Sequence, residues 1–298
     1  MNPWLIVISR GRIGLFEGAT NTGCIALIDK SFDHIYRGLS KGQGPNEISN
    51  GVPRLYVLAD SLYYVDVNYR RSMKLDVQND SLKVVRVDPF NCFCSCSSLL
   101  GDNKALAINY DTAGFLNIVD YKKGRALSSI PFPENTVLSG FDEQVQRSIY
   151  MNTCVANSPD ATKFAYGVCY SEQYGFGRIE HDSLLIDKGY VYSDMKILDI
   201  IDGYILPADD SRANATDAIG TDNHAVFLYS GAGYESDETS IGKDVLVYSW
   251  NGTPVVRLVL DKKVNSIAYD KDRKKLLCLS HIPESLYIEY DLNGIIDL

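Results

Sequence analysis

Short runs of alternating hydrophobic and polar residues fill almost the whole chain, and polar turns separate them. The clearest group contains four such runs, at residues 54–58, 62–66, 72–75 and 82–87. An alternation of period two that is bounded by turn residues is typical of β-strands. This part of the chain is therefore predicted to be a four-stranded antiparallel meander.

Five further groups repeat this plan, and their average length of about fifty residues is typical of propeller blades. The group before this meander has runs at 5–8, 24–28 and 34–36, and the group after it has runs at 93–99, 105–109, 115–119 and 126–132. The next group spans 154–192 and has runs at 164–168, 177–180 and 184–186. The last two groups have runs at 215–220, 225–229, 245–249 and 255–260, and at 264–269, 276–280 and 286–290. The prediction is an all-β, six-bladed β-propeller of four-stranded antiparallel blades, forming one domain over residues 1–298. The first group lacks an opening strand and the last a closing one, so we expect strands from the two ends to pair and close the ring.

One helix is expected to interrupt the strands near residues 140–150. Ser139 and Asp142 form a capping pair, and Phe141, Val145 and Ile149 recur at four-residue spacing. That spacing places the three apolar side chains on one face of a helix. The helix is predicted to pack on the sheets as a short insertion.

A glycine-rich segment at residues 37–48 resembles three catalytic or phosphate-binding motifs without fitting any of them. Lys41 precedes Gly42, whereas a Walker loop needs lysine after glycine, and Glu47 occupies the third glycine position of a dinucleotide fingerprint. Gly38 to Gly42 matches the nucleophile elbow around Ser40, but that motif works only as a turn from a strand into a helix. Glycine, proline and asparagine crowd the following positions, so we predict a plain loop between two strands.

Composition and charge narrow the range of partners. The chain has 45% hydrophobic residues, and its 29 Lys and Arg against 38 Asp and Glu give a net charge of −9. An acidic chain without a basic block is a poor ligand for nucleic acid or an anionic membrane. No apolar run reaches the roughly eighteen residues of a membrane helix. We expect a monomer with no transmembrane segment, no cofactor and no nucleic-acid partner.

The seven cysteines do not have the spacing of a zinc site. Cys92, Cys94 and Cys96 alternate along a predicted strand, which would place their sulfur atoms in a row on one face. A tetrahedral metal needs convergent ligands. These cysteines are therefore predicted to bind no metal and to form no disulfides with one another.

Several short motifs resemble blades of known propellers. Residues 62–66 with Asn68-Tyr69-Arg70 resemble an NHL-type blade, and Ser158-Pro159-Asp160 resembles the turn of TolB-type blades. Residues 42–47 resemble the Gly-x-Gly-Pro-x-Glu element of TolB-like six-bladed propellers, which are common in Bacteroidetes. The resemblance implies a six-bladed propeller, often associated with the cell envelope, with no agreed activity. It therefore implies the envelope or periplasm if an upstream signal is removed, whereas a native start at Met1 implies the cytoplasm.

Two functions remain open from the sequence. The first is a non-catalytic scaffold that binds a protein, peptide or glycan through the loops of one face, without a metal and without catalytic residues. The expected ligand-binding residues are Gln43, Asn46, Glu47, Arg70, Arg71, Asp111, Asp209, Asp210 and Arg212. The alternative is a metal-dependent enzyme of the lactonase or lyase kind at the channel mouth, which needs convergent oxygen and nitrogen ligands. The four histidines are scattered and begin no metal-binding motif, so the scaffold is favoured.

Overall fold

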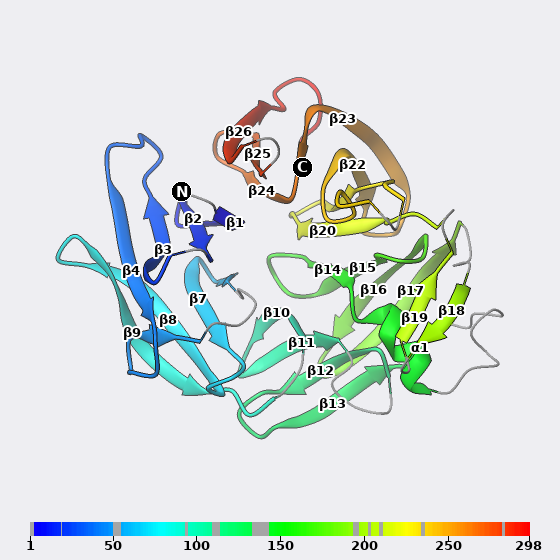
Figure 1. The fold of residues 1–298 in the computed structure, drawn as a ribbon, viewed down its shortest axis with the longest axis horizontal. Coiled ribbons are helices and arrows are strands. Elements are labelled where there is room, and N and C mark those ends of the chain that lie inside the picture. The colour runs from blue at the N-terminus through cyan, green and yellow to red at the C-terminus, as the bar shows by residue number, and fades with distance from the viewer. Residues whose placement is uncertain are drawn as a thin grey trace.

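The protein is a six-bladed β-propeller with antiparallel blades around a central axis (Figure 1), which confirms the predicted fold class. The structure is a computed structural model and describes residues 3–18, 20–49, 55–92, 95–108, 114–132, 143–192, 197–201, 204–208, 211–233, 236–281 and 284–298. Within this part of the chain, no helix is long and apolar enough to cross a membrane.

The first three blades follow one another along the chain as meanders. Blade 1 comprises β1 (Pro3–Ser9), β2 (Arg12–Glu17), β3 (Thr22–Ile28), β4 (Ile35–Lys41) and the short β5 (Glu47–Ile48), which pairs in parallel with β4. Blade 2 comprises β6 (Leu55–Leu58), β7 (Ser61–Asp66), β8 (Arg71–Gln78) and β9 (Ser81–Pro89). Blade 3 comprises β10 (Ser95–Gly101), β11 (Lys104–Ile108), β12 (Leu116–Asp120) and β13 (Arg125–Ile130).

The other three blades complete the ring. Blade 4 comprises β14 (Thr153–Asn157), β15 (Lys163–Val168), β16 (Gln173–Glu180) and β17 (Ser183–Val191). Blade 5 comprises β20 (Ala215–Gly220), β21 (His224–Tyr229), β22 (Gly242–Ser249) and β23 (Pro254–Val264). Blade 6 has only β24 (Ser266–Asp270), β25 (Lys275–Ser280) and β26 (Leu286–Asp291). A two-stranded ribbon of β18 (Ile197–Ile201) and β19 (Tyr204–Pro207), which the sequence pattern did not predict, separates blades 4 and 5.

The predicted helix is present as α1 (Glu143–Tyr150), at the outer side of the ring near β19 (Figure 1). Ile149 and Tyr150 are buried, and the Tyr150 ring lies 5.3 Å from that of Phe115 between centroids. The apolar face of the helix therefore docks on the blade 3 and blade 4 core. The predicted capping residues Ser139 and Asp142, like Phe141, lie outside the described residues.

The ring closes between blades 1 and 6, but without the expected exchange of strands. Each of the two blades keeps its own strands, and β1 lies beside β24. The prediction that blade 1 lacks its opening strand is wrong, because β1 is that strand and the pattern missed the second strand, β2, whose residues from Ile13 to Glu17 are all buried. A shared apolar cluster that contains Ile6, Ile13 and Leu277 packs across the junction.

Polar contacts support this closure at its edges. The Ile6 N–H donates to the Ser266 hydroxyl at 3.4 Å. Lys30 Nζ of blade 1 lies 2.6 Å from a carboxylate oxygen of Asp272 and 3.7 Å from one of Asp270. Side-chain packing and ion pairs thus hold blades 1 and 6 together, as a shared strand does in other propellers.

The number and direction of the strands in each blade determine which loops lie on the same face of the ring. A blade of four antiparallel strands ends on the face where its innermost strand began, so all innermost strands run in the same direction. One face, here named the interblade face, holds the connections between blades and the turns between second and third strands, including residues 42–49, 67–70 and 169–172. The opposite face, here named the hairpin face, holds the turns between first and second strands, including residues 59–60, 158–162 and 221–223.

Candidate ligand-binding channel

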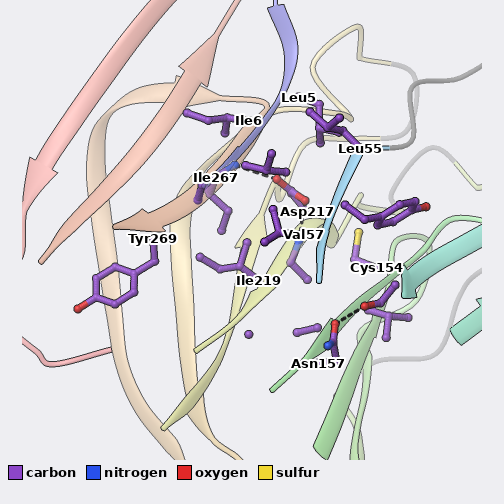
Figure 2. A pocket seen from close by; sticks show the side chains of 18 of the residues that line it. Leu5, Ile6, Leu55, Val57, Cys154, Asn157, Asp217, Ile219, Ile267 and Tyr269 are labelled. Atoms are coloured by element: carbon purple, nitrogen blue, oxygen red, sulfur yellow. Dashed lines mark hydrogen bonds between the residues drawn. The ribbon is translucent and has the colours of Figure 1, made fainter. Parts of the chain in front are cut away.

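The six innermost strands surround a central channel with a cavity volume of about 990 Å³. β1, β6, β10, β14, β20 and β24 all contribute to its wall. Most of the wall is apolar, and Figure 2 shows Leu5, Val57, Ile219 and Ile267 around the cavity. Each innermost strand is an edge strand of its sheet and is paired on one side only, so backbone N–H and C=O groups face the channel beside the side chains of the wall.

Asp217 is the charged group that is most deeply placed in this wall. Its carboxylate accepts hydrogen bonds from the Ile267 N–H at 2.8 Å and the Ala218 N–H at 2.9 Å. Burial raises the pKa of Asp217 to about 6, against these bonds and one from the Ser266 hydroxyl, which lower it. The carboxyl group joins β20 to β24, so its role is to hold blades 5 and 6 together.

A second polar pair joins blades 3 and 4 across the channel wall. The Ser98 hydroxyl donates to Oδ1 of Asn157 (Figure 2), and the Asn157 amide donates to the Ser158 carbonyl at 3.1 Å. Both residues line the channel. Their hydrogen-bonding groups are occupied by each other, so they fix the wall and offer little to a ligand.

The two thiols that line the channel have the properties of core residues. The Cys154 thiol donates to the Ala215 carbonyl at 3.5 Å, and burial raises its pKa well above the ordinary value. Burial also raises the pKa of Cys169 to about 11. A thiol that stays protonated at neutral pH is a poor nucleophile.

Uncharged polar residues line the channel where it opens at the interblade face. Its lining there includes Asn152, Thr153, Tyr170, Thr216, Thr239 and Ser240. The hairpin face is different, because Asp60, Asp222 and Lys271 line that end and the last two form an ion pair. A ligand that enters from the interblade face would therefore meet hydroxyl and amide groups before the apolar wall.

The predicted ligand-binding residues lie away from this channel. Of the nine, Gln43, Asn46, Glu47, Arg70, Arg71 and Arg212 are described, and none of these six lines the cavity. Asp111, Asp209 and Asp210 lie outside the described residues. Gln43, Asn46, Arg70 and Arg212 are exposed.

Glu47 and Arg71 hold the glycine-rich loop in place. Glu47 Oε2 accepts the Gly44 N–H at 2.6 Å. The Arg71 guanidinium donates to the Gly44 carbonyl at 3.0 Å and to the Glu47 carbonyl. The Gly-x-Gly-Pro-x-Glu element is thus closed by its own glutamate and by an arginine of the next blade.

Buried Asp66 completes this clamp, and sequence reasoning did not select it. Its carboxylate accepts the Ser49 N–H at 2.9 Å, the Ser49 hydroxyl at 2.8 Å and the Tyr69 N–H at 3.2 Å. Arg71 lies 3.8 Å from it. An aspartate at the end of a strand, just before a polar turn, was the available signal.

Ser40 lies inside β4 and pairs with Thr22 and Glu47 of the neighbouring strands. No helix follows it, since the chain continues into β5 and blade 2. The prediction that residues 38–42 are not a nucleophile elbow is therefore confirmed, whereas the predicted loop is shorter than expected because residues 37–41 belong to β4.

The histidines and cysteines form no metal cluster among the residues that the structure describes. His34 is exposed and its Nδ1 lies 3.0 Å from Asp29, while burial lowers the pKa of His224 and of His281. No group of three or more His, Cys, Asp or Glu residues converges in this part of the chain. Cys92 is buried, with its thiol 4.0 Å from the Asp120 carbonyl oxygen, and the side chains of Cys94 and Cys96 lie outside what the structure describes.

Sequence reasoning missed the channel lining because the innermost strands have no motif of their own. Their position as the first strand of each repeat was the signal that could have selected them. Asp217 carried a second signal, since it is a carboxylate within the otherwise uncharged run from Ala215 to Gly220.

Comparisons with known proteins support the fold. No protein-family model and no curated protein sequence matches the chain. A protein of Bacteroides fragilis assigned as exported superposes with a TM-score of 0.52 at 11% identity, over 94% of this chain and 79% of that one. The β-propeller domain of Cps50 (Swd1) from Myceliophteria thermophila gives 0.48 at 11% identity over 97% of both chains. Hydrazine synthase from Kuenenia stuttgartiensis gives 0.47 at 11% identity, over 97% of this chain and 96% of that one.

Proposed function

We propose that this protein is a non-catalytic scaffold that binds a peptide or protein segment at the interblade face, with an apolar side chain of the ligand in the central channel. The observation that carries the proposal is the cavity of about 990 Å³, whose wall combines apolar side chains with polar groups and whose mouth at the interblade face is polar. Binding sites of this size are commonly apolar with a few polar groups that orient the ligand.

The chemistry of the wall favours a peptide over a glycan. Sugar hydroxyls would lose hydrogen bonds to water against Leu5, Val57 and Ile219, and that loss is costly without replacement partners. An apolar side chain gains free energy in the same place. The amide group of Asn152 and the hydroxyl group of Ser240 can then bind the ligand's backbone.

The exposed predicted residues extend this surface. Gln43, Asn46 and Arg70 lie in loops of the interblade face, and Arg212 lies in the connection that leads to β20. We propose that they contact the more distant parts of a ligand. Glu47 and Arg71 act through the shape of the loop that they hold.

The enzyme alternative finds less support in the channel. A hydrolase or lyase needs a general base, a nucleophile or a metal near the substrate. Asp217 is engaged by backbone N–H groups, the channel thiols are protonated at neutral pH, and the described residues contain no convergent metal-ligand set. Binding without chemistry is what this arrangement supports best.

Capture of ligands from an extract of the source cells tests the proposal. Val57→Trp places an indole in the channel, whereas Val255→Trp adds the same group on β23, where Val255 is already exposed. We expect the species captured by the wild type to fall about tenfold or more with Val57→Trp and to stay with Val255→Trp, because an indole occupies much of a narrow cavity. Equal capture by both variants, with equal thermal stability, contradicts the channel as the site.

A further inference from the structure

The last strand of blade 6, β26, stands third in its sheet but is exposed like an outermost strand. In the other five blades the third strand contains three to five buried residues, because a fourth strand covers it. In β26 the residues from Leu286 to Tyr290 are all half-buried and Asp291 is exposed. Among the residues that the structure describes, blade 6 therefore has no fourth strand (Figure 1).

The fourth strands of the other blades carry features that discourage pairing with another chain, and in blade 1 the short β5 also covers part of the fourth strand, β4. Lysine or arginine, irregular register and proline are the usual ones. All five strands have a register shift against their neighbour and at least one Lys or Arg, and β9 and β23 also contain proline.

β26 has none of these features. Its sequence, Leu-Tyr-Ile-Glu-Tyr-Asp, contains no Lys, Arg or Pro, and its six residues pair with β25 in unbroken register from Lys275 opposite Asp291 to Ser280 opposite Leu286. A regular strand of this length with a free side is a ready template for strand addition.

The surroundings of β26 suit a further strand. Ile288 and Tyr290 pack towards the core of blade 5, and Tyr287 packs towards the cluster shared with blade 1. Phe32 of blade 1 is 45% exposed, and its ring lies 5.5 Å from that of Tyr287 between centroids. An added strand would cover these aromatic groups with alternate side chains.

The charge at this edge selects the kind of strand. Glu289 is already bound by Arg273 at 2.8 Å and Lys275 at 2.6 Å. Asp291 is exposed, accepts the N–H and amide of Asn293, and has no ion pair among the described residues, while those hydrogen bonds and then the charge of Lys275 on the paired strand lower its pKa. A basic residue would complement it, whereas a second copy of this acidic chain would bring further carboxylates.

We propose that β26 is a docking site for an extended segment of a different polypeptide, which adds as the fourth strand of blade 6 and carries a Lys or Arg beside Asp291. Main-chain hydrogen bonds along the free edge of β26 provide the affinity. The aromatic rings of Phe32 and Tyr287, together with Asp291, determine which segment is preferred. This site lies on the outside of the ring and is separate from the central channel.

A synthetic peptide with the sequence of residues 81–88, Ser-Leu-Lys-Val-Val-Arg-Val-Asp, provides a test, because it forms most of the outer strand β9 of blade 2. Fluorescence anisotropy with the labelled peptide should show saturable binding. Hydrogen–deuterium exchange should show slower exchange of the β26 amides on binding, with no change in β23. Protection of any other strand in place of β26, or no binding, overturns the proposal.

Variants of the peptide test the two parts of the proposal without any risk to the fold of the protein. Proline at the position of Val85 should weaken binding about tenfold, because it removes a main-chain hydrogen bond and blocks pairing. Glutamate at both basic positions, or Asp291→Lys in the protein, should weaken it about two- to fivefold, the range of an exposed ion pair. Restoration of binding when the two charge changes are combined supports the ion pair between the peptide and residue 291. A dimer of the free protein with β26 amides already protected overturns the proposal, since the occupant would then be a second copy.

Discussion

The glycine-rich loop at residues 42–49 and the central channel differ in how their polar groups are used. In the loop, Glu47, Asp66 and Arg71 form hydrogen bonds with backbone groups, and Arg71 also forms an ion pair with Asp66. In the channel, few side chains are charged and the wall is mostly apolar. The segment that looks most functional in the sequence is a structural clamp, and the segment that looks plain encloses the cavity.

The physical reason lies in the backbone. A loop has N–H and C=O groups without sheet partners, so side chains must satisfy them. An innermost strand pairs with the second strand of its blade, which satisfies the backbone groups on that side without any side chain. Polar motifs in the sequence therefore lie where side chains must satisfy the backbone groups of loops. A binding surface can form elsewhere, at strands that need no such side chains.

Removal of the clamp's carboxylate should give the largest effect. Asp66→Ala leaves the Ser49 and Tyr69 N–H groups without their acceptor and a buried guanidinium without its neighbouring charge. We expect a loss of about 3 kcal/mol in the free energy of unfolding, measured by urea denaturation. Ser49→Ala is the matched control and should lose only about 1 kcal/mol, since its N–H remains. Equal losses would contradict the central role of Asp66.

Stability should depend on pH through Asp217 in the channel wall. Its pKa is raised to about 6 from an ordinary 3.8, so between these values the folded state holds a proton that the unfolded state has lost. The free energy of unfolding should therefore fall as pH rises through this window, by about 1 kcal/mol per pH unit.

Asp217→Asn provides the control for this effect, because the amide does not titrate. The difference in unfolding free energy between wild type and Asp217→Asn, measured from pH 4 to pH 7, should shift against the wild type as pH rises. A shift in favour of the wild type would mean that the N–H donors of Ile267 and Ala218 lower the pKa more than burial raises it.

Ser40 should show the smallest effect. Ser40→Ala removes a half-buried hydroxyl within β4, so the free energy of unfolding should change by no more than about 0.5 kcal/mol. A fluorophosphonate probe should label neither protein. Labelling of the wild type that Ser40→Ala abolishes would reinstate the nucleophile elbow and a hydrolase.

The strands of blade 2 were the most predictable part of the fold. Their alternation and polar turns lie within a few residues of the observed β6 to β9. β2 was missed because Ile13 to Phe16 form a continuous apolar run with a glycine, which has no alternation to detect. The ribbon of β18 and β19 was missed because it adds two strands outside the repeating plan.

The candidate site was much less predictable than the fold. Chemical types such as Arg71 and Glu47 drew attention to the loop, but only three-dimensional contacts reveal that their groups are occupied. The channel brings together residues as distant in sequence as Leu5 and Ile267. No local sequence pattern indicates that these residues lie close together, because their proximity results from closure of the ring.

The central claim is that the channel, and not the glycine-rich loop, binds apolar ligand groups. A titration with the apolar dye 1-anilinonaphthalene-8-sulfonate tests it most directly, in wild type, Val57→Trp, Val255→Trp and Arg71→Lys. We predict saturable dye fluorescence that Val57→Trp reduces about tenfold and that the other two variants keep. Dye binding that survives Val57→Trp and disappears with Arg71→Lys would contradict the account and return the site to the loop.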